Sequence, residues 1–505
     1  MSNRSVAQSC HTPRQLRCRP LHKGDFLSEE SPFRGGNKRG VFDQLLLSCC
    51  VVAAALFVAG RAGAGGFQHY EHSALSTGMA NARTALWDDA SSLYFNPAAV
   101  TELAGFQLSL GDSLMTATGG YTPLPEEKRS SPTDGEHSSK VERVLLYPFH
   151  LYFTAKVSRW LTLGIGVTNQ FGLSSFWPED WDGRFTAWQM ELKTFFFQPT
   201  AAVDVARLAG LPKEAALGVA IGLDYVYATV MNRTKIDFSS FGAGAEADLK
   251  VEGEAHGIGV NFALFAAWKP WVSLGASVRS DVNLRFSGDA SFSGIDPQVN
   301  EVLNVIGIVL PESTKQHTSL RLPWNMNFGV AFHGLKRFTF ALDLYVTFWQ
   351  SYDELRVVFD CVRDGACYQG LNEDAVYPKK WKTGYQVSLG VEYRPLKALA
   401  IRIGYGHTIN PTNPEYYDAV VPDGNRHIFC VGLGYRAPKI FKLDMGYLFA
   451  FWSNEKNNKV GAPTLTGQGG YANGSYEIRV HVVSLSLGFS FGSAVRSTQN
   501  ARHFQ

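Results

Sequence analysis

The stretch Val483–Phe491, VSLSLGFSF, alternates between large apolar residues and small residues at every position. Successive side chains of a β-strand point to opposite faces, so this pattern predicts a strand with one apolar face and one small, polar face. The same period of two runs through Val272–Phe286, Phe338–Phe348 and Phe441–Phe451, where the apolar residues fall on one face throughout. Most of the chain after Gly105 is therefore predicted to be β-strand.

Strand length and loop length distinguish a membrane barrel from a soluble β-sandwich. The alternating stretches run for roughly ten to fifteen residues, which suits tilted membrane strands better than ordinary sheets. Short connections such as Lys269–Pro270 alternate with long ones such as Tyr121–Arg143 and Ser287–Ser313. The sequence therefore predicts an all-β fold, a transmembrane antiparallel β-barrel of about 14 strands over residues 105–491. Closure is required because lipid offers no partner to an unpaired backbone group.

The N-terminal residues 1–64 read as a basic extension followed by a secretory signal peptide. Arg34, Lys38 and Arg39 precede an apolar run, Leu45–Ala59, and small residues up to Ala64 complete a cleavage pattern. The alternative is a membrane anchor, but the run is shorter than the roughly 20 residues that a spanning helix needs. Residues 492–505 are predicted to form a C-terminal tail.

The net charge and the spacing of cysteines argue against nucleic-acid binding and against a metal site. The formal net charge of the 505 residues is +2, which gives no case for nucleic-acid binding. Of the seven cysteines, Cys361 and Cys367 bracket a short acidic loop and could form a disulfide in an oxidising compartment. The spacing of His and Cys predicts no metal site, and the sequence predicts no cofactor.

A separate segment, residues 65–104, lacks strand alternation and is rich in Ala, Ser and Gly. A barrel of this width leaves an open lumen unless something fills it, so we expect this segment to form a hatch, a plug inside the barrel. At its centre lie Phe95, Asn96, Pro97 and Ala98. Pro97 cannot continue a helix, and the Asn96 side chain can bond to nearby backbone, which predicts a tight polar turn.

The run GFQHYEHSALSTGMANARTALWDDASSLYFNPAAVTEL, residues 66–103, resembles the N-terminal hatch of FadL-type outer-membrane transporters of long-chain fatty acids and hydrocarbons. Asn96-Pro97-Ala98 matches that family's NPA motif. Two further stretches resemble the family's second extracellular loop with its following strand and a late strand entry, FGLSSFWPEDWDGRF…ELKTFFFQPTAAVDV and VPDGNRHIFCVGLGYR. The resemblance spans Gly66 to Phe491.

The resemblance implies passive transport across the outer membrane of a Gram-negative cell, without enzyme activity and without ATP. Its ligand would be a long-chain fatty acid or a related hydrophobic compound. The hatch would move about Asn96-Pro97, and the ligand would leave sideways beside a kinked third strand, where Gly164 and Gly166 could permit the kink. Expected partners are outer-membrane lipid, lipopolysaccharide and the barrel-assembly machinery. We expect no nucleic acid as a partner, and we expect a monomer.

Candidate ligand contacts are apolar residues of one long loop and basic residues facing the lumen. In Pro297–Leu310, apolar residues including Val302 and Ile306 recur at helical spacing, which predicts a landing helix for a hydrophobic ligand or one that packs on its neighbours. A cation beside an apolar pocket could pair with a carboxylate, or with an acidic residue of the wall such as Asp281, Asp343, Glu392 or Asp444. The candidate cations are Arg279, Arg285, Arg321, Arg402, Arg184, Arg426 and, as the first choice, Lys382.

Three alternatives remain open at this point. The substrate could be a monoaromatic hydrocarbon such as toluene instead of a fatty acid. A lipid-hydrolysing barrel would need a serine and a histidine together, and His317 and Ser319 share a strand face. A porin or purely structural barrel is disfavoured because a hatch would block a diffusion pore.

Overall fold

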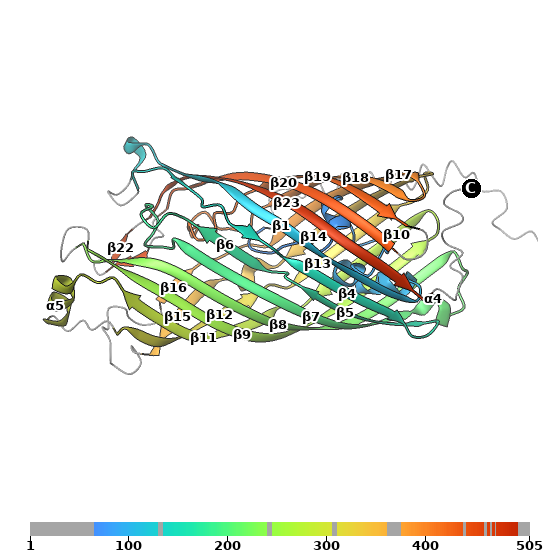
Figure 1. Ribbon diagram of the computed structural model, residues 1–505, viewed down its shortest axis with the longest axis horizontal. Coiled ribbons are helices and arrows are strands. Elements are labelled where there is room, and N and C mark those ends of the chain that lie inside the picture. The colour runs from blue at the N-terminus through green and yellow to red at the C-terminus, as the bar shows by residue number, and fades with distance from the viewer. Residues whose placement is uncertain are drawn as a thin grey trace, which may run out of the picture. The chain divides into compact units, whose positions relative to one another are not determined.

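The computed structural model describes residues 65–129, 135–239, 245–305, 311–360, 375–437, 441–458, 462–464, 467–469 and 471–492. Long antiparallel strands wind obliquely around a barrel (Figure 1). The strands are β1 (Phe106–Pro123), β2 (Ser139–Lys140), β3 (Leu145–Leu146), β4 (Phe149–Lys156), β5 (Leu161–Thr168), β6 (Gly172–Phe176), β7 (Gln189–Asp204), β8 (Ala215–Asp237), β9 (Glu246–Trp268), β10 (Val272–Arg279), β11 (Val282–Ser293), β12 (Ser313–Leu322), β13 (Asn325–Phe332), β14 (Phe338–Thr347), β15 (Glu354–Phe359), β16 (Ala375–Pro378), β17 (Gly384–Leu396), β18 (Leu399–Ile409), β19 (Arg426–Arg436), β20 (Phe441–Lys456), β21 (Ala462–Thr464), β22 (Gly467–Gly469) and β23 (Gly474–Phe491).

The helical segments are short. They are α2 (Ala74–Thr77), α3 (Ser92–Phe95), η1 (Pro97–Glu102), η2 (Glu126–Lys128), α4 (Val205–Leu208), α5 (Pro297–Val305) and η3 (Trp349–Ser351). Across the described ranges, none of the helices has both the length and the apolar character to pass through a membrane.

The barrel closes between its first and last strands. β1 pairs with β4 on one side and with β23 on the other, in a ladder from Phe106–Phe491 to Pro123–Gly474. Several wall strands are built from two segments in series. In the described residues the wall order is β1, β3–β4, β5–β6, β7, β8, β9, β10–β11, β12–β13, β14–β15, β16–β17, β18, β19, β20 and β23. This is the predicted closed barrel of fourteen strands.

The part of the wall toward the short turns has the predicted polarity, with apolar residues outside and small polar residues inside. On β23, Val483 and Leu485 face outward and are about half exposed, whereas Ser484 and Ser486 face inward and are buried. The long connections and α5 lie at one end of the barrel, and the short turns and α4 lie at the other (Figure 1). In outer-membrane barrels the short turns face the periplasm and the long loops face outside.

The wall reverses its polarity partway along the barrel. On β10, Leu274 faces outward, but beyond the break between β10 and β11 Leu284 and Phe286 are buried inside. The register between this wall strand and β9 shifts by one residue at the break. Arg279 of β10 pairs with Asn261, and the same register would pair Ser287 with Gly253, but Ser287 of β11 pairs with Glu254. A one-residue slip turns every side chain to the other face. The prediction of one apolar face along Val272–Phe286 is therefore wrong.

The neighbouring wall strand makes the same change between β12 and β13. Leu320 and Leu322 are buried inside, while Phe328, below the break, faces outward. Arg285 and Arg321, predicted as lumen candidates, lie on the outer face for this reason, and Arg321 Nε bonds to Asp281 at 2.5 Å. The part of the barrel toward the long loops, which we call the upper part, thus has an apolar interior and a polar exterior. This polarity is expected of a region outside the membrane.

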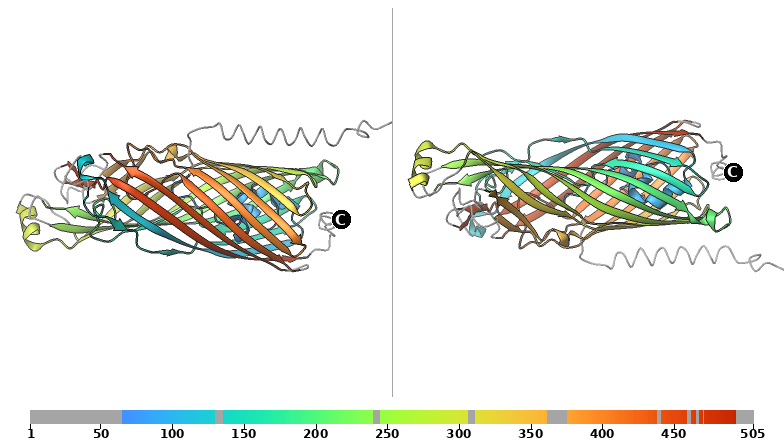
Figure 2. Two further views of the ribbon diagram at one scale, coloured as in Figure 1. Left: turned by 90° about the horizontal axis from the view of Figure 1, so that it is seen from above. Right: turned by 90° about the horizontal axis from the view of Figure 1, so that it is seen from below.

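The segment Gly65–Ala104, which we call the hatch, lies inside the barrel near the end that carries α4 (Figure 2). α2 packs on β19, β20 and β23, and η1 packs on β7, β8 and β9. The Ala74 N–H donates to Ser486 Oγ at 2.8 Å, and the hydroxyls of Thr77 and Ser484 are 2.9 Å apart. The hatch therefore contacts opposite sides of the wall.

Glycines on the inner face of the wall and in the hatch let the two backbones approach closely. A Cβ on Gly275 of β10 would lie 1.9 Å from the Thr84 carbonyl oxygen, and one on Gly78 would lie 2.8 Å from the Gly432 Cα of β19. No side chain fits at such distances, so these positions need glycine if the hatch is to stay in place.

Candidate ligand path

Asn96 ties the hatch to the wall. The Asn96 Nδ2 amide donates to the Thr84 carbonyl at 2.8 Å and to the Leu264 carbonyl of β9 at 2.9 Å. The Asn96 Oδ1 accepts from the Ala98 N–H at 3.1 Å, and Pro97 begins η1. The structure has the predicted polar turn, with Phe95, Asn96 and Ala98 fully buried. A hinge role for Asn96-Pro97 stays a prediction, whereas these bonds make Asn96 an anchor.

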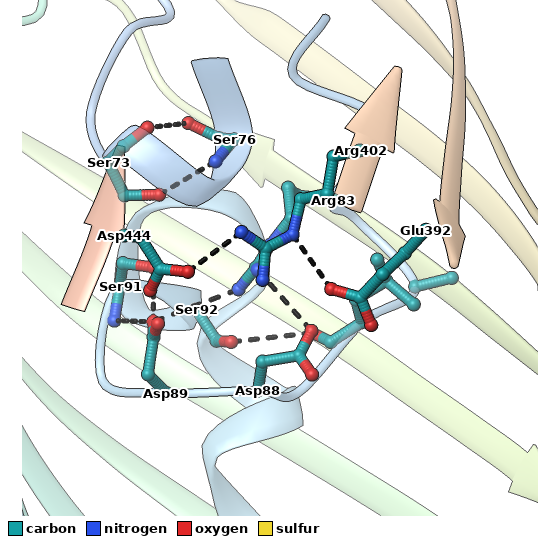
Figure 3. Close-up of polar contacts among 12 residues, drawn as sticks. Ser73, Ser76, Arg83, Asp88, Asp89, Ser91, Ser92, Glu392, Arg402 and Asp444 are labelled. Carbon is teal, nitrogen blue, oxygen red and sulfur yellow. Dashed lines mark hydrogen bonds and ion pairs between the residues drawn. The ribbon is translucent and has the colours of Figure 1, made fainter. Parts of the chain in front are cut away.

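Eight charged side chains form a closed ring between hatch and wall. Figure 3 shows part of it, with Arg83, Asp88, Asp89, Glu392, Arg402 and Asp444 labelled. Bases and acids alternate around it, and each side chain contacts two of opposite charge within 4.0 Å. Arg402 Nε, for example, lies 2.7 Å from Glu392 Oε2, and Arg402 Nη1 lies 2.7 Å from Asp444 Oδ1. In order, the ring is Arg83, Asp88, Arg394, Glu392, Arg402, Asp444, Lys442 and Asp89.

Three members of this charge ring come from the hatch, namely Arg83, Asp88 and Asp89, and the others come from β17, β18 and β20. Four positive and four negative charges balance, so no buried charge in the ring is left without a counterion. The prediction that lumen cations could pair with acidic residues of the wall is confirmed for Arg402, which pairs with Glu392 and Asp444. The ring fixes residues 83–89 of the hatch against the wall.

Above this fixed part, the N-terminal residues of the hatch border a cavity of about 170 Å³. One side of the cavity is made by Gly66–Glu71, and another by Gly172–Phe176 of β6. The remaining lining is mostly apolar, with contributions from β1, β19, β20 and β23. Apolar lining with a few polar groups is typical of a site for a hydrophobic small molecule. The apolar lining residues from these strands are Met115, Ala117, Ile428, Leu448, Ala450, Trp452, Ile478, Val480 and Val482.

Phe67 of the hatch is inserted into a cluster of aromatic residues, which we call the aromatic cage. The Phe67 ring centroid lies 4.6 Å from that of Trp349, 5.8 Å from that of Tyr352 and 6.0 Å from that of Trp381. Phe171, at 6.3 Å, completes the cage. All five rings are buried, and the cage belongs to the apolar interior of the upper barrel.

Arg426 is the one arginine or lysine among the described residues that line the cavity. Its guanidinium donates to Asp423 Oδ1 at 2.7 Å and to the Gly66 carbonyl at 2.8 Å, and it lies over the Trp452 ring at 4.6 Å. Asp423 Oδ2 in turn accepts from the Gly66 N–H at 2.5 Å. The Arg426–Asp423 pair therefore holds the N-terminus of the hatch and leaves Arg426 already neutralised.

The carboxylates of Glu71 and Glu142 line the same cavity. With Asp423, they make three carboxylates to one guanidinium. The lining is thus net acidic, which disfavours a ligand that carries a carboxylate.

The third wall strand is interrupted beside the cavity. β5 pairs with β4 and β7 up to Thr168, and the chain resumes at Gly172 as β6, which pairs with β7. The residues between turn toward the hatch, where the His69 N–H donates to the Gln170 carbonyl at 2.8 Å and Gln68 forms a β-bridge with Phe171. The interruption lies here and not at Gly164 and Gly166, which sit in the regularly paired part of β5. At Gly164 the missing side chain instead gives room to Leu93 of the hatch.

The other predicted contacts lie away from the cavity. Lys382 is exposed, and Arg184 Nη2 bonds to Glu246 Oε1 at 2.7 Å. α5 has the predicted helical form, with Val299 and Leu303 buried against Phe238 and Ala247, while Val302 is 42% exposed. Ile306, Cys361 and Cys367 lie outside the described residues.

A buried ion pair beside the aromatic cage joins the loop after β16 to the loop between β18 and β19. Lys379 Nζ contacts Asp418 Oδ2, and both side chains are more than nine-tenths buried. Burial alone would lower the pKa of Lys379, but Asp418 and then Tyr352 outweigh it and raise that pKa above the ordinary value. Among the described residues, no group of three His, Cys, Asp or Glu could hold a metal ion.

A closed β-barrel with a hatch in its lumen and an apolar cavity between them is the architecture of an outer-membrane transport protein. The chain belongs to the family of outer membrane protein transport proteins (OMPP1/FadL/TodX), whose model matches residues 55–491. It is therefore an outer-membrane transporter of hydrophobic compounds.

Individual relatives and solved structures resemble this chain over most of its length. Outer membrane protein P1 of Haemophilus influenzae is 24% identical over 437 residues, covering 81% of this chain and 90% of the relative. The crystal structure of a Pseudomonas aeruginosa FadL homologue superposes with a TM-score of 0.70 at 16% identity, covering 85% of this chain and all of the homologue. The Pseudomonas putida toluene transporter TodX gives 0.61 at 15% identity, covering 84% and 99%.

Proposed function

We propose that this transporter carries uncharged hydrophobic compounds, with monoaromatic hydrocarbons as the best-supported class. The proposal rests on the contacts of Arg426. Its guanidinium is already bonded to the Asp423 carboxylate and to the Gly66 carbonyl of the hatch. A bound carboxylate would have to displace Asp423 and would face two further acidic side chains. Aromatic rings in the cage offer edge-to-face partners to an aromatic ligand.

Long-chain fatty acid remains the second candidate. It is favoured by the presence of a guanidinium in an otherwise apolar cavity, since a carboxylate could form a bidentate pair with Arg426. Under this alternative Asp423 would have to release Arg426 when the ligand arrives.

The deciding experiment compares binding of toluene, a long-chain fatty acid and the methyl ester of that acid to the purified protein. The ester keeps the chain and removes the charge. We expect toluene and the ester to bind more tightly than the acid, and Asp423→Asn to raise the affinity for the acid by freeing Arg426. Lys382→Ala is the matched control, because Lys382 is exposed and should not change binding.

Tighter binding of the acid than of the ester, abolished by Arg426→Met, would establish the fatty-acid alternative instead. If none of the three compounds bound, the assignment of this cavity as the ligand site would be wrong.

We further propose that the ligand passes from the aromatic cage to the cavity and leaves sideways beside β6. The route opens when residues 65–71 of the hatch move, while the part held by the charge ring stays fixed. A disulfide between Gln68→Cys and Phe171→Cys, which form a β-bridge, should stop transport until it is reduced. The control disulfide joins Thr77→Cys to Ser484→Cys in the fixed part and should leave transport unchanged. Transport that survives the first disulfide would contradict this route.

A further inference from the structure

Three histidines and two phenylalanines form a continuous patch on the outer face of four neighbouring strands. His407 of β18 pairs directly with His427 of β19, which pairs with Phe451 of β20. Phe449, on the same face of β20, pairs directly with His481 of β23. Successive ring centroids along this line are 4.8, 5.6, 5.7 and 5.0 Å apart. We call these five residues the boundary patch.

The boundary patch lies where the outward face changes from apolar to polar. Below His427 on β19, Phe429 and Val431 face outward and are 50% and 53% exposed. Beyond His481 on β23 the outward residues are Arg479 and Glu477. In a membrane barrel this transition marks the level of the lipid headgroups.

Tyrosine hydroxyls orient two of the imidazoles. The Tyr405 hydroxyl lies 3.0 Å from His427 Nδ1, and the Tyr447 hydroxyl lies 2.9 Å from His481 Nδ1. Each tyrosine comes from the preceding wall strand. Within the described part of the chain neither Nε2 atom has a hydrogen-bond partner, so both are available to a ligand at the headgroup level.

The charges around the patch are mixed, and the one nearest to His481 is a base. Arg479 lies two residues before His481 on the same face of β23 and is exposed, without a partner among the described residues. The acids on the same outer face are Glu477 of β23, Glu455 of β20 and Asp112 of β1. No acid is a direct cross-strand neighbour of a patch histidine.

We propose that the boundary patch binds phosphate groups of lipid headgroups in the outer leaflet, with His427 and His481 presenting Nε2 to the phosphate oxygens. An imidazole whose Nδ1 accepts a bond from the tyrosine hydroxyl carries its proton on Nε2 and can donate it to a phosphate oxygen. Arg479 adds a permanent charge beside His481. The proposal does not depend on which compound the barrel transports.

A third tyrosine–histidine pair provides a matched control. The Tyr225 hydroxyl lies 2.8 Å from His256 Nδ1 on β8 and β9, again at the apolar-to-polar transition. There, however, the neighbouring outward residue on β9 is Glu254, which accepts a bond from the Tyr227 hydroxyl at 3.0 Å. A phosphate should be repelled at this pair, although its aromatic character is the same.

The test measures binding of lipid A and of enzymatically dephosphorylated lipid A to the full-length protein in neutral detergent, by native mass spectrometry. The double variant His427→Phe/His481→Phe keeps the rings and removes the nitrogens. We expect it to lose about fivefold in affinity for lipid A, since roughly 1 kcal/mol of hydrogen bonding is removed. His256→Phe should have no effect.

Equal binding of the two lipids by the unmodified protein, or full retention of lipid A by the double variant, would overturn the proposal and leave an aromatic anchor only. Competition by inorganic phosphate at the lipid concentration would show a site for the free ion and would overturn the assignment to lipid. An unchanged unfolding temperature of the double variant in neutral detergent serves as the folding control.

Discussion

Phe67 and Trp349 meet edge to face, with their ring planes inclined by 66°. One ring belongs to the N-terminal part of the hatch and the other to η3, next to the upper wall. This contact stands between the apolar interior of the upper barrel and the cavity. On the proposed route, a single aromatic side chain of the hatch therefore stands in the path of the ligand, next to the part of the hatch that must move.

Replacement of Phe67 by alanine should open this route. A single aromatic contact is worth about 0.5–1.5 kcal/mol, and about 1.4 kcal/mol is a factor of ten in rate, so entry of a hydrophobic fluorescent probe into proteoliposomes should be at least roughly tenfold faster. Phe95→Ala is the control, because Phe95 is equally buried but lies beside Asn96 in the fixed part of the hatch. Equal acceleration by both variants would show that any loss of hatch packing causes leakage and that the cage has no special role.

Breaking the charge ring should destabilise the protein strongly. Arg402→Met leaves Glu392 and Asp444 without one of their two counterions in a buried site, and the loss should be about 3–5 kcal/mol in the free energy of unfolding. Arg321→Met removes an exposed arginine from its pair with Asp281 and should cost about 1 kcal/mol or less. Urea unfolding in detergent micelles measures both. Similar losses for the two variants would contradict the ring's role in holding the hatch.

Asn96→Asp should loosen the hatch without preventing the barrel from forming. The carboxylate keeps the bond from the Ala98 N–H but cannot donate to the carbonyls of Thr84 and Leu264, each of which would cost about 1–3 kcal/mol when left unpaired. Hydrogen exchange of hatch amides should become faster, while the strand amides stay protected. Pro97→Ala should have little effect, because Pro97 supplies no bond. If Asn96→Asp left hatch exchange unchanged, the anchor assignment would fail.

Gly275→Val should displace the hatch by direct collision. The added Cβ would meet the Thr84 carbonyl oxygen at a distance that no packing can accommodate. We expect a new permeability to small sugars in a liposome-swelling assay. The neighbouring Ala276→Val, on the outward side of β10, adds the same volume toward lipid and should leave the barrel impermeable. A tight barrel in Gly275→Val would mean that the hatch tolerates a shift at this point.

The sequence predicted the barrel, its strand number and the buried Asn96 turn, because each depends on local pattern or local chemistry. The reversal of polarity at Ser280–Asp281 was not predicted, since strict alternation continues across the break and a one-residue register slip leaves no mark in the pattern. The pairing of Arg402 was anticipated as one of two options. Phe67 and the cage were missed because their five rings come from distant parts of the chain, and a lone aromatic in a hatch carries no signal. Lys382 was preferred over Arg426 on resemblance alone, and only the fold shows that Arg426 lines the cavity.

The reversal of polarity between β10 and β11, and again between β12 and β13, also determines how deep the barrel sits in the bilayer. A barrel with a uniform apolar exterior could slide along the membrane normal with little cost until its rim reached water. Here a shift toward the periplasm would bring Arg285 and Arg321 into hydrocarbon, and the opposite shift would bring Leu274 and Phe328 into water. In a bilayer of different thickness the lipid must therefore adapt to the protein, which keeps the interruption between β5 and β6 at one fixed depth.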